Sequence, residues 1–387
     1  TVDFGGGLQT NAGVYDVFVV CYDASGEHRW SKSLGGAQAE MCGGLGVSAA
    51  GAVFVTGYFS GTVDFGGGPL TSAGLDIFLA GFDAAGVPLW SKRFGDWDQD
   101  FGKGVAIDDS GSVYLTGQLW SSGVDFGGGV LPRSTGPDAF IAAFSPTGGH
   151  LWSKRLADTS HSESNDIAIG PSGNVFVTGA FYETIDPGGG SLTSTGEADV
   201  FVASFDAKGL HRWSSAFGGV DIESSARIAV GDNVFVTGMF RGTMNSDVGS
   251  LVSAGIDDMF VAGLGPGGAQ RWVRRCGGAS QDFSYDIAVG PEGHVFMTGG
   301  FQGTADCFGG GDLVSAGSAD IVVASVDADG GLRWSKRYGG SSYDSGGGIS
   351  LTAEGDILLS GVLTPVVDFG NWQISGDEDA FLIHLVP

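Results

Sequence analysis

Short runs in which large apolar residues alternate with small or polar ones recur along the whole chain. The stretch from Asp76, DIFLAGFD, is one such run; the turn DAAG and then VPLWSKRFG follow it. A glycine-rich loop leads on to GVAIDDSG and SVYLTGQLW. β-Branched and aromatic runs of this length, bounded by Gly, Asp, Ser or Pro, are typical of β-strands. Since no stretch shows convincing helical periodicity, the pattern predicts an all-β protein.

This group of four predicted strands repeats at a nearly constant interval. The Asp-led run opens seven times, at intervals of 60, 62, 61, 59, 62 and 59 residues, at Asp16, Asp76, Asp138, Asp199, Asp258, Asp320 and Asp379. A tryptophan follows the same interval, at Trp30, Trp90, Trp152, Trp213, Trp272 and Trp334. Four short antiparallel strands per unit are typical of a β-propeller blade. The sequence therefore predicts a single β-propeller domain over residues 1–387, with four-stranded antiparallel blades.

Six blades are expected, because six strands match the position nearest the propeller axis. These inner strands are expected to begin near Leu45, Val105, Ile167, Ile228, Ile287 and Ile349. The Asp-led strand occurs once more than that, and we expect its last copy, from Asp379, to pair beside the hairpin at 16–34 and close the ring. Seven blades are the alternative if the two ends form separate partial blades, or if strands upstream of Thr1 are missing.

The word DFGGG is expected to have a structural role. It occurs at Asp3, Asp64 and Asp125, with altered copies at Asp186, Asp306 and Asp368. We expect it to form the turn between two strands of successive units. Phe65 and its equivalents are then expected to fill a gap between blades.

Composition limits the classes of partner. The chain has 72 Gly and a formal net charge of -26. Nucleic-acid binding is not expected, because it needs clustered Lys and Arg. Insertion into a membrane is not expected either, because no apolar run reaches the length of a spanning segment. The chain begins at Thr1, so we expect that a signal peptide has been removed or that the chain was excised from a longer one.

One position per unit, just before the inner strand, is usually acidic. It is occupied by Glu40, Asp100, Ser162, Glu223, Asp282 and Asp344. The functional interpretation is a polar rim or a cation site around one mouth of the channel, and Ca²⁺ is the cation expected there. The structural interpretation is that each carboxylate accepts backbone N–H groups of the glycine-rich turn. Because the feature recurs in every unit, the structural interpretation is favoured.

Residues that depart from the repeat are better candidates for ligand binding, since repetition does not explain them. The loop GDWDQD adds Asp96, Trp97 and Asp98, and QLWSSG adds Trp120. The stretch at 158–166 adds His161 and Glu163. An exposed tryptophan among carboxylates suits binding of carbohydrate, or binding assisted by Ca²⁺. The alternative is a loop anchored by its own tryptophan.

The four cysteines form two candidate pairs. Cys276 and Cys307 stand where another unit has Phe94 and Phe126, so they can bridge if those aromatic rings touch. Cys21 and Cys42 replace small residues of the next unit and are the second candidate pair. Two disulfides would fit an oxidising compartment.

The units resemble the bacterial β-propeller repeat called SBBP. The matching residues are Asp76, Phe78, Asp83, Gly86, Trp90, Ser91, Asp100, Gly111 and Gly117. The resemblance covers nearly the whole chain and implies the propeller architecture. It also implies a secreted or surface protein similar to those of myxobacteria. It implies little about activity, since members of this family are mostly uncharacterised.

We therefore expect a non-catalytic, secreted or cell-surface propeller that binds protein or glycan. One alternative is a lectin that holds sugars at its tryptophan-containing loops. Another is a hydrolase or lyase that uses mouth carboxylates such as Asp100 and Asp282, although the sequence has no known catalytic motif. A fourth is a subunit of a larger extracellular assembly.

Overall fold

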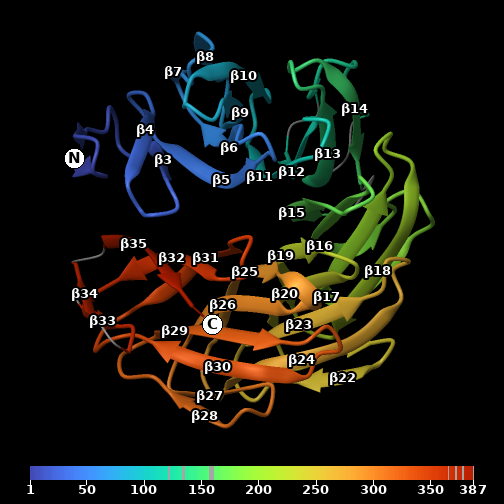
Figure 1. Ribbon diagram of the computed structural model, residues 1–387. Helices are drawn as coiled ribbons and strands as arrows, with labels where there is room; N and C mark the ends of the chain where they lie inside the picture. The colour runs from blue at the N-terminus through green and yellow to red at the C-terminus, as the bar shows by residue number, and fades with distance from the viewer. Residues whose placement is uncertain are drawn as a thin grey trace. The chain divides into compact units, whose positions relative to one another are not determined.

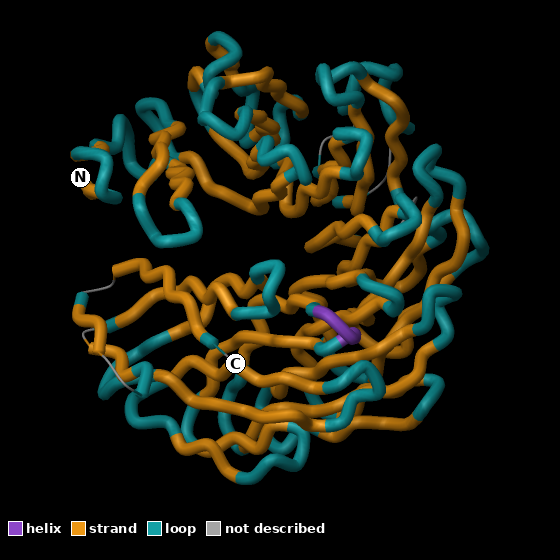
Figure 2. The backbone as a smooth tube through the Cα atoms, in the orientation of Figure 1, coloured by secondary structure: helices purple, strands orange, loops and turns teal. Residues whose placement is uncertain are grey.

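The computed structural model describes residues 1–120, 123–132, 136–156, 161–364, 366–370, 373–376 and 379–386. The chain divides into two compact units. Unit 1 comprises Thr1–Ile169, Ile185–Gly188 and Asp206–Leu210, and unit 2 comprises Gly170–Thr184, Gly189–Phe205 and His211–Pro387. Within the described ranges, strands make up nearly all regular structure, and the one helical element is the 3₁₀ turn Pro291–Gly293 (Figure 2).

Five sets of four strands follow the antiparallel blade order. Unit 1 holds two of them (Figure 1), β5 (Glu40–Val47), β6 (Val53–Phe59), β9 (Asp76–Phe82) and β10 (Pro88–Phe94), then β11 (Asp100–Ile107), β12 (Val113–Leu119), β13 (Asp138–Phe144) and β14 (His150–Arg155). Unit 2 holds two, β19 (Glu223–Val230), β20 (Val234–Phe240), β23 (Asp258–Leu264) and β24 (Gln270–Gly278), then β25 (Phe283–Val289), β26 (Val295–Phe301), β29 (Asp320–Val326) and β30 (Leu332–Tyr338). The fifth set has β15 (Ser162–Ile169) in unit 1, and in unit 2 mainly β16 (Val175–Ile185), β17 (Leu192–Phe205) and β18 (His211–Gly219).

The protein is thus an all-β propeller with five blades, and the expectation of six or seven blades is wrong. The strands left over at the two ends form smaller sheets. One pairs β3 (Val17–Tyr22) with β4 (His28–Leu34). The other has the order β31 (Ser345–Leu351), β32 (Ile357–Leu363), β35 (Asp379–Leu385). The sixth inner strand, β31, therefore belongs to a sheet of three strands. Closure of the ring by the terminal strands stays a prediction, as does the single domain.

Short hairpins lie between the second and third strands of a sheet, except for the first hairpin, which precedes β3, and those that join another blade make the sheets unequal in size. They are β1 (Val2–Asp3) with β2 (Leu8–Gln9), β7 (Thr62–Asp64) with β8 (Pro69–Thr71), β21 (Thr243–Ser246) with β22 (Gly249–Val252), β27 (Thr304–Cys307) with β28 (Asp312–Val314), and β33 (Val366–Asp368) with β34 (Gln373–Ser375). Two of them extend a blade, because β21 pairs with β18 and β27 pairs with β24.

The DFGGG word forms the turn of such a hairpin, as predicted. In the β7–β8 hairpin, Asp64 Oδ1 accepts the N–H groups of Gly66 at 2.8 Å and Gly68 at 3.0 Å. Phe65 is buried, and its ring stacks on that of Phe78 with centroids 4.4 Å apart. It shares one apolar cluster with Val17 of β3, so it fills the space between two neighbouring sheets.

The repeated tryptophans on the outer strands also pack between neighbouring sheets. Trp30 Nε1 donates to the carbonyl of Ala84 at 3.1 Å, in the turn between β9 and β10. Gly86 of that turn has a φ of 77°, and a Cβ there would lie 2.8 Å from the Trp30 ring. Four other tryptophans repeat this bond, Trp90 to Pro146, Trp152 to Ala207, Trp213 to Pro266 and Trp272 to Ala328. Packing therefore explains these five tryptophans of the series.

Candidate functional site

Two exposed tryptophans of unit 1 lie on adjoining segments. Trp97, which is 84% exposed, belongs to the loop between β10 and β11, and Trp120, 48% exposed, directly follows β12. The backbone N–H of Trp120 donates to the carbonyl of Gln99 at 3.1 Å. A Cβ on Gly123 would lie 3.0 Å from Asp96 Oδ2, so Gly123 lies beside the same loop. We call Asp96, Trp97, Asp98, Gln118, Trp120 and His161 the tryptophan site.

A side-chain network holds Trp120 in place. Its indole Nε1 donates to Gln118 Oε1 at 3.0 Å, and Gln118 Nε2 lies 3.0 Å from His161 Nε2. The rings of Trp120 and His161 meet edge to face, with centroids 6.3 Å apart. Gln118 is 5% exposed and also donates to the carbonyl of Ser162 at 3.3 Å. The network orients one face of an exposed indole, which reduces the entropy lost when a ligand binds there.

The structure brings together most of the candidate ligand-binding residues predicted from the sequence. It differs from that prediction in two ways: Glu163 pairs with a lysine, and an unpredicted residue, Gln118, belongs to the site. Glu163 forms an ion pair with Lys103 at 2.6 Å, and Lys103 also bonds Asn165. Gln118, which orients Trp120, was missed. The sequence does show that Gln118 departs from the repeat, because no other unit has an amide side chain at this position. The matching residues are Tyr58, Ala180, Met239, Gly300 and Val362. Residues 158–160 of the same stretch lie outside the described residues.

The acidic series before the inner strands is buried and bound to backbone. Glu40, Asp100, Glu223, Asp282 and Asp344 are at most 1% exposed. Asp344 accepts the N–H groups of Gly340 at 2.7 Å and Thr364 at 2.8 Å, and Asp282 accepts those of Gly278 and Gln302. Ser162 occupies the matching position in the remaining unit and accepts the N–H of Ala139 at 3.0 Å. These contacts support the structural interpretation.

Burial raises the pKa values of four members of this series. Desolvation raises the pKa of Asp282 to about 6 and that of Glu223 to about 8. It also raises the pKa of Glu40 and Asp344, against the backbone hydrogen bonds that lower it. Among the described residues, no three His, Cys, Asp or Glu side chains lie close enough to hold a metal ion. Because Asp100 and Asp282 are 0% exposed, neither is placed to touch a substrate.

In four repeats, the Asp that begins the Asp-led strand pairs with an arginine on the next strand. Arg93 binds Asp76 at 3.0 Å, Arg155 binds Asp138 at 2.8 Å, and Arg275 binds Asp258 at 2.7 Å. Arg337 and Asp320 make the same pair. The arginine always stands three residues after the repeated tryptophan. This regularity is visible in the sequence and was missed there.

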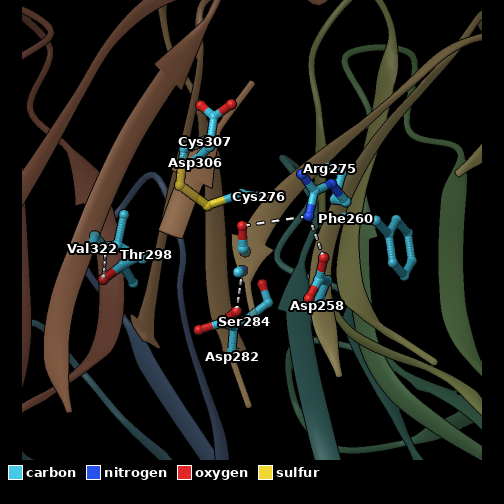
Figure 3. The surroundings of a disulfide bond; sticks show 12 residues. Asp258, Phe260, Arg275, Cys276, Asp282, Ser284, Thr298, Asp306, Cys307 and Val322 are labelled. Carbon is cyan, nitrogen blue, oxygen red and sulfur yellow. Dashed lines mark hydrogen bonds and ion pairs between the residues drawn. A yellow bond between two sulfur atoms is a disulfide. The ribbon is translucent and has the colours of Figure 1, made fainter. Parts of the chain in front are cut away.

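One of the two predicted disulfides is formed. Cys276 of β24 and Cys307 of β27 lie directly opposite each other and are bonded (Figure 3). The expectation rested on Phe94 and Phe126, whose ring centroids are indeed 4.8 Å apart. The Cys21–Cys42 bridge is not present: Cys21 is a half-buried thiol and Cys42 is exposed. Cys21 Sγ lies near the carbonyl of Tyr22, and Cys42 Sγ near that of Gly44.

These blades and their repeat define the β-propeller class. Residues 89–121 match the SBBP β-propeller repeat, which confirms the repeat type predicted from the sequence. One curated relative is the uncharacterized WD repeat-containing protein L264 of Acanthamoeba polyphaga mimivirus, 20% identical over 78% of this chain and 27% of its own length. Another is the regulatory protein FlaEY of Caulobacter vibrioides, 24% identical over 46% of this chain and 19% of its own. The chain thus spans about a quarter or less of these relatives.

Two solved structures are also similar. One is a protein of unknown function from Bacteroides caccae, with a TM-score of 0.36 and 10% identity over 85% of this chain and 92% of that one. The other is a gluconolactonase from Xanthomonas campestris, with a TM-score of 0.37 and 12% identity over 90% of this chain and 87% of that one. No helix of the described residues is long and apolar enough to cross a membrane.

Proposed function

We propose that this chain is a non-catalytic β-propeller binding module that recognises carbohydrate through the tryptophan site of unit 1. The observation that carries the proposal is a pair of exposed tryptophans, Trp97 and Trp120, on adjoining segments beside carboxylates and a buried amide. Indole rings bind apolar faces of sugars, while carboxylate and amide groups accept or donate hydrogen bonds to their hydroxyls. Both tryptophans depart from the repeat, so packing of the repeat does not require them.

The buried carboxylates support a non-catalytic role. Each is used to hold the backbone of a turn, and none is exposed for general acid or base chemistry on a bound glycoside. We propose further that the protein acts outside the cell, as bacterial proteins with this repeat would. The Cys276–Cys307 disulfide supports that location, because disulfides persist in oxidising compartments. The module would serve as one part of a larger surface or secreted assembly.

A glycan array followed by calorimetry tests the ligand class. We expect wild-type protein to bind a defined set of glycans, and the Trp97→Ala/Trp120→Ala variant to bind them about tenfold more weakly or not at all. Leu89→Ala is the matched control, because Leu89 is a comparably exposed apolar residue on β10 of the same unit. It should bind as wild type does.

Three results would contradict this proposal. Full glycan binding by the double tryptophan variant would place the site elsewhere. Release of free sugar from array glycans would show an enzyme instead. Absence of glycan binding together with capture of a protein partner, lost in the double variant, would assign the site to protein recognition.

A further inference from the structure

The Asp-led series and the acidic series before the inner strands meet within a repeat. Each of the first six Asp residues of the Asp-led series is followed 24 residues later by a residue of the other series, as in Asp258 and Asp282. A Cβ on Gly277 would lie 2.7 Å from Asp258 Cγ and 2.8 Å from Asp282 Oδ2, so the two carboxyl groups lie on either side of this glycine. Arg275 Nη1 binds Asp258 Oδ2 at 2.7 Å (Figure 3). One guanidinium group thus offsets the charge of two buried carboxyl groups.

The repeat of Asp199 and Glu223 in unit 2 lacks this arginine. Ala216 stands at the position held elsewhere by Arg93, Arg155, Arg275 and Arg337. Asp199 is 3% exposed and Glu223 is 0% exposed. No ion pair with either is present in the described part of the chain. Two acidic groups are therefore buried together without the cation that four sister repeats supply.

Both carboxyl groups keep an oxygen atom without a hydrogen-bond partner. Thr195 donates to Asp199 Oδ2 from its backbone at 3.1 Å and from its hydroxyl at 3.4 Å, and Gly219 donates to Glu223 Oε2 at 2.7 Å. Asp199 Oδ1 and Glu223 Oε1 have no partner among the described atoms. Buried acceptors left in this state are costly, so they favour any donor that can reach them.

The first repeat also lacks an arginine, but its Asp16 has a substitute donor that Asp199 does not have. Ser33 takes the place of the arginine and donates to Asp16 at 3.2 Å. Asp16 is also only half-buried, so water reaches it. An alanine provides no such donor for Asp199.

We propose that the Asp199–Glu223 pair is a binding site for one guanidinium group, supplied by a ligand or a partner protein in place of the missing arginine. Ala216 is half-buried and Thr195 is exposed, so the approach that an arginine side chain would take starts at the surface. A guanidinium group fits better than a metal ion. Its planar N–H groups can donate to Asp199 as those of Arg275 donate to Asp258, whereas no three His, Cys, Asp or Glu side chains of the described residues lie close enough to hold a metal ion.

The titration of the pair agrees with this geometry. Burial raises the pKa of Asp199, and burial together with the charges of Asp199 and Asp221 raises that of Glu223 to about 8. Protons therefore compete with the cation. Binding should be strong above pH 8 and weak near pH 5, where Glu223 is protonated.

Calorimetric titration with methylguanidinium, at pH 8.5 and pH 5, tests the site on the full chain. We expect saturable binding to wild type at the higher pH, and about a tenfold loss of affinity in Glu223→Gln. Ala216→Arg should abolish this binding and raise the melting temperature, because it restores the arginine of the sister repeats. Arg275→Ala should lower the melting temperature and add a second methylguanidinium site.

Several results of these titrations would overturn the proposal. Equal binding by wild type and Ala216→Arg would overturn the proposal, as would binding that is unaffected by Glu223→Gln. Should Ala216→Arg fail to fold, Glu223→Gln, which removes one charge with little change of shape, still decides the matter. Displacement of methylguanidinium by Ca²⁺ at equal ionic strength would show a metal site instead.

Discussion

At the residue scale, Arg155 makes the most buried ion pair among those described. Its side chain is 5% exposed and that of Asp138 is 0% exposed. Arg155→Ala would leave a buried carboxylate without its cation, so we expect it to lower the free energy of unfolding by about 3–5 kcal/mol. Chemical denaturation measures this. Arg241→Ala is the control, because Arg241 is 46% exposed beside Asp257 and should cost only about 0–1 kcal/mol. Equal losses would contradict the argument.

The raised pKa of Glu223 predicts an unusual dependence of the free energy of unfolding on pH. Its pKa is raised from 4.5 to about 8 in the folded protein, chiefly by burial. The folded state therefore binds this proton more tightly than the unfolded state does. The stabilisation is complete below pH 4.5 and is lost as pH rises towards 8, with a slope of at most about 1.4 kcal/mol per pH unit.

Glu223→Gln isolates this contribution. The variant should lose stability less steeply than wild type between pH 5 and pH 8, as measured by urea denaturation at several pH values. Glu27→Gln, in the exposed turn after β3, is the control and should leave the slope unchanged. Parallel curves for wild type and Glu223→Gln would show that this carboxyl group is ionised at neutral pH.

At the element scale, the Cys276–Cys307 bond fastens the β27–β28 hairpin to β24. It closes a loop with a sequence separation of 31, for which chain entropy predicts a stabilisation of about 3–4 kcal/mol. We expect Cys276→Ala/Cys307→Ala to lose roughly this amount in thermal or urea unfolding. Reduction with dithiothreitol should reproduce the loss in wild type. Cys21→Ala, which removes a half-buried thiol, should have a much smaller effect.

The DFGGG hairpin depends on its aromatic residue. Phe65 is 1% exposed and contacts the rings of Phe59 and Phe78. Phe65→Ala should therefore cost about 3–5 kcal/mol by cavity formation. Phe4, the matching residue of the first copy, is only half-buried, so Phe4→Ala should cost less. A reversed order in urea unfolding would contradict the view that this residue fills the gap between sheets.

The elements were largely predictable and the number of blades was not. Strands could be located because β-branched and aromatic runs end at Gly and Asp, and the match of Cys276 and Cys307 to Phe94 and Phe126 correctly indicated a disulfide. The number of inner strands, however, gives the number of repeats, and a repeat does not always form a complete sheet of four strands. The sheet that begins with β31 has no outer strand after β35, while β4 pairs with β3. Which terminal strands pair depends on tertiary contacts that local pattern does not contain. Gln118 was missed for a similar reason, because its role depends on His161, which is distant in sequence.

At the scale of the whole molecule, charge is the dominant property. The net charge is -26, and although several carboxylates are buried and bonded to backbone, most of the excess faces solvent. Self-repulsion of this size destabilises a compact state. Salt screens it, since the Debye length falls from about 10 Å at 0.1 M to about 3 Å at 1 M.

We therefore expect the melting temperature to rise as NaCl is increased from about 0.05 M to about 0.5 M, and choline chloride to act equally well. CaCl₂ at the same ionic strength separates screening from binding. If the buried carboxylates before the inner strands are only backbone acceptors, as their contacts indicate, calcium should add no more than the small excess expected for a divalent counterion. A large, saturable rise with calcium that Asp282→Asn or Asp344→Asn abolishes would instead restore the calcium site as a function of these carboxylates. A melting temperature that falls with NaCl would mean that attraction between charges outweighs repulsion, despite the net charge.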